Sequence, residues 1–413
     1  MREGWQIRQL GDVCSLLNRG ISPAYMDKGG VCVLNQKCIR NHEVSYEPAR
    51  RHDDAAKKVA EARFIQLGDV LVNSTGTGTL GRVAQVRSEP VEATTVDSHV
   101  TIVRPKPGLF HLEFFGYMLV VIEEAIKEAG EGCGGQTELA RSVLAERFTV
   151  SYPESLVEQQ RIVSLLDEAF AGLATAKANA EQSLQNARAL FESHLQSVFS
   201  QRGEGWSETT IGELVADGIL VKPFDGNHGE IHPKKADYTE SGVPFIMARD
   251  LQNGLTNTEQ CIYIPRGLAD SLRVGFAMDG DVLLSHKGTI GRSAIVSTGD
   301  DYIMLTPQVA GYRVKDSSQL FNRFIRYYFM SPGFQREIVA AAADGSTRAY
   351  IGITKQFALR FVLPPLPEQK RIAARLDDLN LETQRLTRLY ERKLAALEVL
   401  KKSLLHQAFN GEL

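Results

Sequence analysis

Leu363-Pro-Pro-Leu-Pro-Glu-Gln-Lys-Arg-Ile372 is the stretch that decides the fold, because an extended segment ends there and a long helix begins. A residue that precedes proline avoids the right-handed helical region, so these prolines close the extended segment. Apolar residues then recur every three or four positions, which predicts a helix with one continuous apolar seam. That seam consists of Ile372, Leu376, Leu379, Thr383, Leu386, Tyr390, Leu394, Leu397, Leu400, Leu404 and Ala408.

A second copy of this helix start lies earlier in the chain. Tyr152-Pro-Glu-Ser-Leu-Val-Glu-Gln-Gln-Arg-Ile162 precedes a seam of the same kind, and equivalent positions differ by 210 residues (372 − 162 and 368 − 158). The first seam consists of Ile162, Leu166, Ala169, Leu173, Ala176, Ala180, Leu184, Ala187, Phe191, Leu195 and Val198. About half of the chain is therefore a copy of the other half.

The segments ahead of the two helices also repeat, and they are rich in strand-like sequence. Gly68-Asp-Val-Leu-Val-Asn-Ser-Thr-Gly matches Gly280-Asp-Val-Leu-Leu-Ser, and each continues through a Gly/Thr loop and a Gly-Arg pair into another strand. Aromatic-rich helices are predicted at Phe114–Ala129 and Phe321–Ala342. The predicted fold class is α+β, with two β-rich domains joined by two long antiparallel coiled-coil helices in a pseudo-two-fold repeat. The predicted boundaries are 1–152, 153–200, 201–363 and 364–413.

The two helices are expected to pair with each other. At roughly 1.5 Å per residue, about 40 residues make a helix about 60 Å long, and its narrow apolar stripe needs a partner. Residues 158–200 carry three Lys or Arg and five Asp or Glu, a net charge of −2, whereas residues 368–410 carry nine and six, a net charge of +3. Opposite charge favours this pairing, and the result is a stiff rod with a globular domain at each end. The alternative is two helical hairpins folded into ordinary separate cores.

The composition is that of a globular protein of several domains. The chain has 413 residues, 43% of them hydrophobic and 23% charged, and its net charge of −3 argues against non-specific coating of nucleic acid. No apolar run approaches the length of a membrane span, and the first residues do not resemble a secretion signal, so we expect a cytoplasmic protein. The five cysteines, at irregular spacings, are expected to be free thiols rather than zinc ligands or disulfides.

The sequence contains no catalytic pattern that we can support. The loop at residues 73–82 is rich in Gly and Thr, but it lacks the Gly-Lys-Ser/Thr ending of a phosphate-binding loop and precedes a strand rather than a helix. His228 and His232 lie in a loop without an acidic partner at metalloprotease spacing, so a metal site is not expected. Motifs of hydrolases and of adenine methyltransferases are absent.

The loops instead carry side chains suited to DNA. Arg, Lys, Asn and Gln can make bidentate contacts with base edges, and Ser and Thr suit phosphates. For any single residue, an ordinary solvated loop remains the alternative, whereas for the loops as a group DNA binding is favoured. The candidate DNA-binding residues are Arg19, Tyr25, Asn35, Gln36, Lys37, Arg40, Asn73, Ser74, Thr75, Thr77 and Thr79 in the first copy, and Lys222, Asn227, His228, Lys234, Arg249, Asp250, His286, Lys287 and Thr289 in the second.

These features together resemble the specificity subunit of type I restriction-modification systems, over essentially the whole chain. The two helix starts carry the resemblance, with Glu158-Gln-Gln-Arg-Ile162 after Tyr152-Pro and with Leu363–Ile372, and the Gly-Asp-Val-Leu stretches at Gly68 and Gly280 support it. The first start departs from the family pattern, because Tyr-Pro-Glu-Ser-Leu-Val replaces the Pro-Pro-Leu-Pro of the second. The beginning of the first helix is therefore less well defined.

The resemblance implies a non-catalytic subunit with two target-recognition domains, each reading one half of a split DNA sequence, and a rod that sets the gap. Because the copies diverge in their loops, the target is expected to be asymmetric. Two methyltransferase (M) subunits are expected to dock on this chain, and restriction (R) subunits to join through them. Cofactors are expected only in those partners, as S-adenosylmethionine and as ATP with Mg. The residues assigned to docking and the helix starts are Glu158, Gln159, Arg161, Glu368, Gln369 and Arg371.

Alternative functions remain open at this point. One is the recognition subunit of another multi-subunit methyltransferase or restriction system. A second is an enzyme, either the recognition part of a fused restriction-methylation polypeptide or a lone nuclease, which the absent methyltransferase and nuclease motifs disfavour. Another is a protein scaffold that imitates DNA, which would need a far more acidic surface than a net charge of −3 provides.

Overall fold

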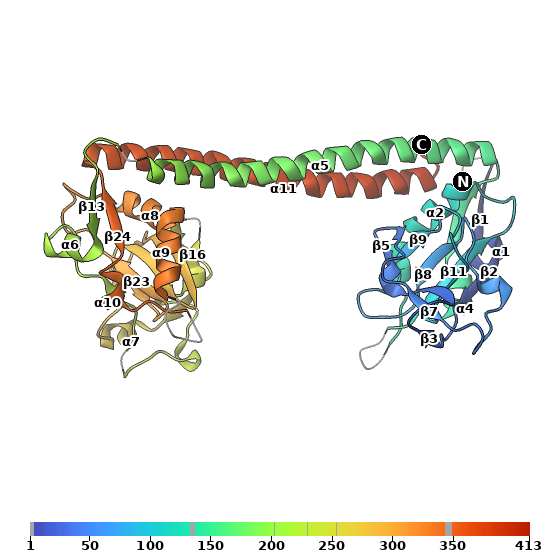
Figure 1. Cartoon of the computed structure of the whole chain (residues 1–413), viewed down its shortest axis with the longest axis horizontal. Coiled ribbons are helices and arrows are strands. Elements are labelled where there is room, and N and C mark those ends of the chain that lie inside the picture. Colours follow the sequence, from blue (N-terminus) through green and yellow to red (C-terminus); the bar gives the residue numbers. More distant parts are fainter. Residues whose placement is uncertain (1–3, 133–136, 202, 229, 253, 343–348) are drawn as a thin grey trace. The chain divides into compact units, whose positions relative to one another are not determined.

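The computed structural model describes residues 4–132, 137–201, 203–228, 230–252, 254–342 and 349–413. The chain forms two compact units (Figure 1). Unit 1 comprises Met1–Glu181 and Arg392–Leu413, and unit 2 comprises Gln182–Glu391. Each long helix therefore contributes to both units.

Unit 1 contains two four-stranded sheets, with strand orders β2-β11-β8-β9 and β10-β4-β7-β3. The pairing of β10 with β4 is parallel and the other pairings in these sheets are antiparallel. Its elements are β1 (Trp5–Gln9), α1 (Leu10–Val13), β2 (Cys14–Arg19), β3 (Tyr25–Met26), β4 (Val31–Leu34), η1 (Gln36–Cys38), β5 (Ile39–Arg40), β6 (Glu43–Val44), β7 (Arg50–His52), η2 (Glu61–Arg63), β8 (Val70–Asn73), β9 (Val83–Gln85), β10 (Thr94–Val96), β11 (Val100–Pro105), α2 (Leu112–Val121), α3 (Glu123–Glu128), α4 (Arg141–Glu146), β12 (Thr149–Pro153) and the first part of α5 (Leu156–Ser200).

Unit 2 repeats this plan with sheets of order β14-β23-β20-β21-β17-β16 and β18-β15-β22-β19. Its elements are β13 (Ser207–Thr210), α6 (Ile211–Ala216), β14 (Phe224–Asp225), η3 (Lys235–Asp237), β15 (Val243–Ile246), η4 (Ala248–Asp250), β16 (Leu251–Gln252), β17 (Leu255–Thr256), β18 (Ile262–Ile264), α7 (Arg266–Ser271), β19 (Phe276–Ala277), β20 (Val282–Lys287), β21 (Thr289–Ile295), β22 (Ile303–Leu305), β23 (Val309–Tyr312), α8 (Asn322–Met330), α9 (Pro332–Ala342), α10 (Ile353–Gln356), β24 (Arg360–Leu363) and α11 (Leu366–Phe409).

The central strand of each unit is apolar along its whole length because both of its faces are buried. In β8, Val70 and Val72 pack into the core that contains the aromatic helix, whereas Leu71 packs into a second core on the other face. In β20, Leu284 packs into the core that contains the aromatic helix of unit 2, and Leu283 packs into the second core on the other face. The predicted internal repeat thus extends to the arrangement of two cores in each unit.

Matching polar contacts hold the two copies of the scaffold. Asp69 binds Arg104 through two hydrogen bonds of 2.7 Å, and Asp281 binds Arg313 in the same way at 2.8 and 2.7 Å. All four residues lie on or beside the central strands and their neighbours β11 and β23. The two copies therefore share side-chain contacts as well as backbone topology.

Each predicted aromatic helix is divided into two helices in the structure. The first breaks at Ile122, between α2 and α3, and the second at Ser331, between α8 and α9. Ser331 has an extended backbone (φ −60°, ψ 141°) because Pro332 follows it, and a residue before proline is excluded from the helical region. The expectation of a single helix at Phe114–Ala129 and at Phe321–Ala342 is therefore wrong.

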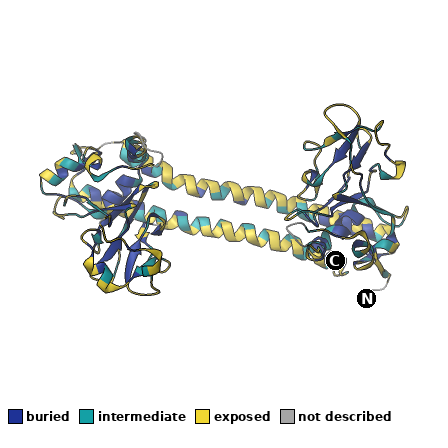
Figure 2. Cartoon of the chain, turned by 90° about the horizontal axis from the view of Figure 1, so that it is seen from below, coloured by how far each residue is buried: buried dark blue, intermediate teal, exposed yellow. Residues whose placement is uncertain are grey.

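The two long helices confirm the predicted antiparallel coiled coil. Within unit 1, Lys177 of α5 pairs with Glu398 of α11 at 2.7 Å, and within unit 2, Arg188 pairs with Glu391 at 2.9 Å. The partner number falls as the residue number rises, as antiparallel packing requires. Figure 2 shows exposed residues over most of the outer faces of both helices.

The seam of α5 is confirmed, because every residue predicted for it is buried or half-buried. The seam of α11 is confirmed except at Leu400, which is 47% exposed. Lys401 is half-buried in its place, with its ammonium 5.2 Å from the centre of the Phe170 ring. A spacing of 3.5 residues brings position 401 to the seam after Leu394 and Leu397, and the lysine stem provides the apolar contact there.

Candidate nucleic-acid interface

The central strand of each unit ends in a loop that is braced by the same two backbone hydrogen bonds. In unit 1, the 74–76 segment lies antiparallel to the 137–139 segment. Leu139 N donates to Ser74 O and Gly76 N donates to Thr137 O, so that Thr75 pairs with Glu138 as in a β-bridge. In unit 2, Ile351 N donates to His286 O and Gly288 N donates to Ala349 O, so that Lys287 pairs with Tyr350 in the same way. All of these positions differ by 212 residues, so the two braced loops are equivalent.

The side chains on the two braced loops are different. In unit 1, Thr75 accepts a 2.6 Å hydrogen bond from Gln36 and lies 2.7 Å from His99 Nδ1. In unit 2, the equivalent Lys287 is exposed, and its ammonium lies 5.7 Å from the centre of the Tyr350 ring. The same backbone frame therefore presents the Thr75 hydroxyl opposite Glu138 in unit 1 and a cation beside an aromatic ring in unit 2.

The structure brings several of the predicted residues of unit 1 together around this loop. Gln36 of η1 contacts both Thr75 and Thr79, and Asn73 donates to the Gln36 carbonyl at 3.1 Å. Arg19 lies beside them, with its guanidinium 2.6 Å from Glu138 and donating to Leu139 O. Lys37, Arg40 and Thr77 are exposed. Tyr25 lies on a separate strand, 43% exposed, under the guanidinium of Arg50 at 3.4 Å.

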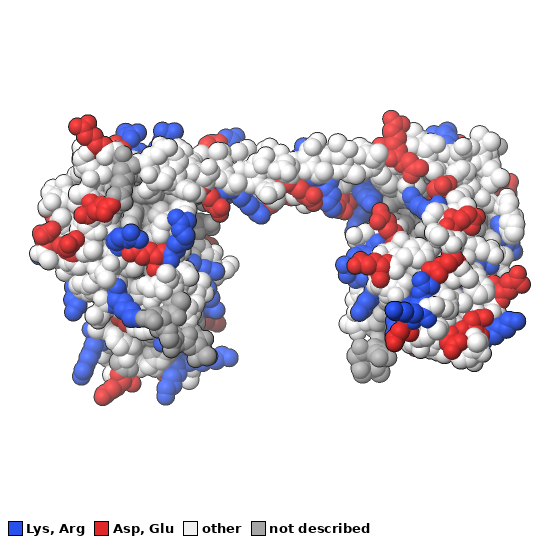
Figure 3. Space-filling model, viewed as in Figure 1, with Lys and Arg blue, Asp and Glu red and all other residues white. Residues whose placement is uncertain are grey.

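In unit 2, the exposed predicted residues are on several loops. Lys287 and Thr289 flank the hairpin between β20 and β21, where Gly288 has a φ of +77° that a residue with a side chain rarely adopts. Lys222, His228, Lys234 and Arg249 are exposed on other loops. Figure 3 shows mainly Lys and Arg side chains at the end of unit 2 that is remote from the long helices.

Five of the predicted residues are buried and support the loops rather than facing solvent. Asn73 and Ser74 lie at the end of β8. Asn227 donates to Ile231 O, and Asp250 accepts a hydrogen bond of 2.8 Å from Met247 N. Burial raises the pKa of Asp250 above its ordinary value. His286 is fully buried, with Nε2 3.0 Å from Asp225 and Nδ1 2.9 Å from the Ile351 carbonyl, so it connects the strand to the bracing segment. The burial of these five side chains favours a supporting role over direct base contact.

Sequence reasoning missed three side chains at this surface, Arg50, Glu138 and Tyr350. Glu138 and Tyr350 occupy equivalent places on the two bracing segments, and alignment of those segments at the 212-residue offset would have found them. Nothing in the sequence pointed to Arg50, because its stacking on Tyr25 depends on the pairing of β3 with β7.

The residues at the two helix starts fall into two groups. Gln159 and Gln369 are fully buried, and each accepts from a backbone N–H (of His111 and Phe321, respectively) and donates to two backbone carbonyls of its own unit. Glu158 and Glu368, in contrast, have partly exposed side chains paired with Arg161 and Arg371. The glutamines therefore fasten each long helix to its unit, and the ion pairs lie at the surface.

A tyrosine in each unit extends this fastening. Tyr117 donates to Asp167 at 2.5 Å, and Tyr327 donates to Asp377 at 2.6 Å. Burial, followed by the bond to Asp167, raises the pKa of Tyr117 to about 12.

The described residues offer no site for metal or thiol chemistry. Within them, no three His, Cys, Asp or Glu side chains lie close enough to hold a metal ion. Cys14, Cys32, Cys38 and Cys261 are free, and burial raises the pKa of Cys14 to about 12, so that thiol is inert near neutral pH. Cys133 lies outside the described residues.

The match to a known family agrees with the two-fold repeat. The family described as "Type I restriction modification DNA specificity domain" matches residues 2–185 and again residues 204–396. The chain belongs to this family. As a specificity subunit, it shares 21% identity with the putative type I restriction enzyme MjaX specificity subunit of Methanocaldococcus jannaschii, over all of this chain and 94% of that protein. It shares 26% identity with the EcoKI specificity subunit of Escherichia coli, over 51% of this chain and 44% of that protein.

Solved structures support the fold of the specificity subunit over its whole length. A chain solved in work on complex assembly and conformational transition of the type I R-M system has a TM-score of 0.79 at 19% identity, covering 100% of this chain and 99% of that chain. The HsdS subunit from Thermoanaerobacter tengcongensis has a TM-score of 0.62, also at 19% identity, covering 100% and 98%. Among the described residues, no helix is both long and apolar enough to span a bilayer.

Proposed function

We propose that this specificity subunit reads a bipartite, asymmetric DNA target, with one half contacted by each unit, and that it performs no chemistry itself. The observation that carries the proposal is the pair of braced loops, which share two backbone hydrogen bonds but present Thr75 and Glu138 in one unit and Lys287 and Tyr350 in the other. A shared frame with different side chains is what two readers of different half-sites require, because base edges are distinguished by side-chain hydrogen bonds.

The exposed cations and the buried polar residues have separate roles in this proposal. Lys37, Arg40, Lys222, Lys234, Arg249 and Lys287 contact phosphates or base edges, since they are the exposed, charged members of the candidate set. Buried Asn73, Ser74, Asn227, Asp250 and His286 hold the loops in place. Exposed Tyr25 with Arg50, and Tyr350 with Lys287, offer planar surfaces beside positive charge.

The two helix starts support docking of two methyltransferase subunits, one near each start. Arg161 and Arg371 have side chains that are 44% and 64% exposed, and each is held toward its helix by a glutamate three residues earlier. Because equivalent surfaces occur twice, two copies of one partner can bind in equivalent ways. In this assembly, S-adenosylmethionine is held by the M subunits, R subunits with ATP and Mg join through them, and the complex acts in the cytoplasm.

The experiment that tests this function is selection from a random DNA library by the purified complex of this chain with its M subunits. The expected result is one enriched motif with two fixed segments of different sequence, separated by a gap of unspecified bases. Replacing unit 2's loop residues Lys287 and Thr289 should change only one segment. Recovery of unselected DNA, or of a continuous motif with no gap, would contradict the proposal.

A further inference from the structure

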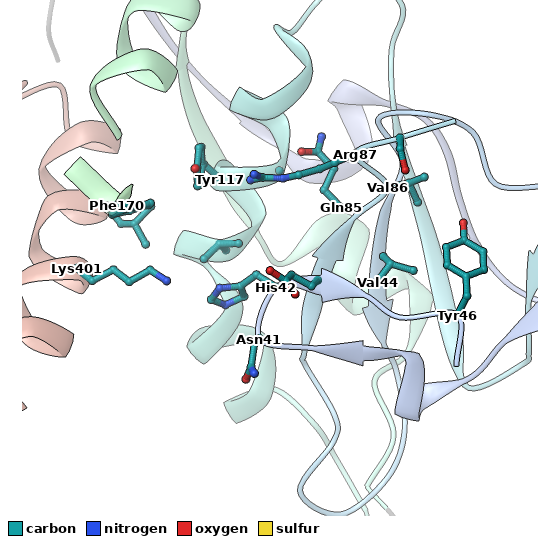
Figure 4. Close-up of a pocket in the computed structure, with 15 residues that line it drawn as sticks. Asn41, His42, Val44, Tyr46, Gln85, Val86, Arg87, Tyr117, Phe170 and Lys401 are labelled. Carbon is teal, nitrogen blue, oxygen red and sulfur yellow. The ribbon is translucent and has the colours of Figure 1, made fainter. Parts of the chain in front are cut away.

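Unit 1 contains a pocket of about 470 Å³ where its β5–β6 hairpin and α2 meet the two long helices. We refer to it as the elbow pocket. It is lined by Arg87, Tyr117, Gln85 and Tyr46 from the domain, by Phe170 of α5 and by Lys401 of α11 (Figure 4). This volume lies in the range of pockets that hold small ligands. Neither braced loop contributes a residue to the elbow pocket, so the proposed function does not account for the pocket.

Two cations, Arg87 and Lys401, line the elbow pocket. The Arg87 guanidinium lies 5.2 Å from the centre of the Tyr117 ring, and the Lys401 ammonium lies 5.2 Å from the centre of the Phe170 ring. Arg87 also hydrogen-bonds Tyr117, and Lys401 adds to the hydrogen bond from Lys177 in lowering the pKa of the nearby Glu398 carboxyl. Figure 4 shows both side chains extending toward the space between the domain and α11. One acid, Glu43, also lines the pocket, so positive charge predominates there.

The buried wall of the pocket carries a polar atom without a partner. Gln85 is only 5% exposed, and its Nε2 donates to Leu112 O at 2.6 Å, whereas its Oε1 accepts no hydrogen bond from the described residues. This oxygen has almost no exposed surface, and an added Cβ at Gly116 would lie 2.3 Å from it, so it packs against α2 and is closed to a ligand in the pocket.

The internal repeat shows that the wall of the pocket formed by Gly116 and His42 is specific to unit 1. Position 116 is Gly116 in unit 1, where an added Cβ would lie 2.3 Å from Gln85 Oε1, and position 326 in unit 2 is a buried arginine, Arg326. The hairpin residue facing it also differs. Unit 2 has Gly254, whose added Cβ would lie 2.0 Å from Arg326 Nη2, whereas unit 1 has His42 at a φ of +63°. Unit 2 therefore fills this place with its own side chain, and unit 1 leaves it open.

His42 adopts a backbone conformation that glycine provides in unit 2 without strain. A non-glycine residue at positive φ is strained and persists where its surroundings hold it. In unit 1, the His42 ring lies 2.7 Å from Glu123, which Lys127 also contacts at 2.8 Å. This contact holds the hairpin against α3 and keeps the rim of the elbow pocket in place.

From these contacts we propose that the elbow pocket binds a nucleoside phosphate. The phosphate lies between Arg87 and Lys401, and the base packs beside the rings of Tyr46 and Tyr117. Two sources share this chemistry: a free nucleotide, and an unstacked nucleotide of a DNA strand. The second source rests on the proposed function, whereas the first does not.

The test uses the full-length chain and AMP as the probe, with binding followed by calorimetry. Arg87→Ala and Lys401→Ala should each weaken AMP binding at least about tenfold, because a hydrogen bond to a charged group contributes about 1.5–3 kcal/mol. Gly116→Arg, which places the unit 2 residue in unit 1, should abolish binding by filling the pocket. Lys393→Ala is the matched control, an exposed lysine of the same helix that does not line the pocket, and it should leave binding unchanged.

A second arm measures duplex binding by the complex with its M subunits. If DNA is the source, AMP does not bind, and the Arg87→Ala and Lys401→Ala complexes lose at least about tenfold in affinity for target and non-target DNA alike, while Lys393→Ala does not. The motif selected from random DNA stays the same, which separates this result from failure of the proposed function. The inference is overturned if AMP fails to bind and the pocket variants bind DNA as the control does. Circular dichroism and thermal unfolding must show each variant to be folded.

Discussion

At the scale of single residues, the two buried glutamines at the helix starts are the strongest link between the sequence repeat and the structure. Gln159 and Gln369 differ by 210 positions, and each binds three backbone groups of its own unit. Their place in the repeat could be predicted. Their burial could not, because glutamine in a charged segment such as Glu-Gln-Lys-Arg is usually exposed.

Replacing Gln369 by alanine should destabilise unit 2. The change leaves the Phe321 amide and the carbonyls of Gln319 and Pro364 without partners, and unsatisfied buried groups cost about 1–3 kcal/mol each, so we expect a loss of at least about 3 kcal/mol. Urea unfolding measures it. Gln384→Ala, on the same helix but only half-buried, should change stability by about 0.5 kcal/mol or less. Equal losses in the two variants would refute the fastening role.

Glu123 predicts a dependence of unit 1 stability on pH. Burial alone would raise its pKa, but hydrogen bonds from His42 and Lys127 more than offset burial and lower the pKa below its ordinary value of 4.5. A carboxylate with a lowered pKa stabilises the fold above its unfolded pKa, and the stabilisation is lost as the pH falls below about 4.5.

Glu123→Gln should therefore lower the thermal midpoint at pH 7, and the difference from the wild type should shrink as the pH falls below about 4.5. Thermal unfolding at a series of pH values tests this. Glu124→Gln serves as the control, since that side chain is 66% exposed. A midpoint difference that is constant over pH would show that the ionised pair does not contribute.

At the scale of elements, the sequence predicted the apolar seams and central strands well because their periodicity is set by burial itself. It failed where one residue changes the local geometry. Pro332 divides the second aromatic helix, and Lys401 replaces Leu400 on the seam through its alkyl stem. The burial of His286 and Asp250 could not be predicted either, because polar residues where a strand passes into a loop are usually exposed, and only the packing around them shows otherwise.

The braced hairpin between β20 and β21 provides a test at this scale. Lys287→Ala should weaken binding of the second half-site by about 1–3 kcal/mol, or roughly tenfold or more, if Lys287 contacts a base edge or phosphate. Binding measurements on duplexes altered in one half at a time would locate the effect. Lys315→Ala, an exposed lysine elsewhere in unit 2, is the control. An effect of Lys287→Ala confined to the other half-site would disprove the assignment of this loop.

At the scale of the whole molecule, one chain carries two related units and two paired helices. Family membership and the repeat agree on that arrangement. The sequence could not supply the elbow pocket, because it arises from a coupled difference between the copies, Gly116 with His42 against Arg326 with Gly254. Each difference alone looks like ordinary divergence.

The proposed role of the rod predicts the effect of lengthening it. Inserting seven residues into the middle of both α5 and α11 preserves the seam, because the seam repeats every 3.5 residues. The gap between half-sites should grow by up to about three base pairs, from seven rises of about 1.5 Å against about 3.4 Å per base pair, while both half-site sequences stay the same. Inserting three residues breaks the seam and should destabilise the pair. Changed half-site sequences after the seven-residue insertion would argue against a spacing role.

The central claim is that this chain alone dictates which DNA sequence its complex marks. It is tested most directly by methylome sequencing of cells that carry the chain with its methyltransferase partner, compared with cells that lack only the chain. The account predicts a single methylated motif with two unlike halves and a fixed gap, which disappears when the chain is removed. A motif that persists without the chain, or an ungapped palindrome that depends on it, would contradict the account.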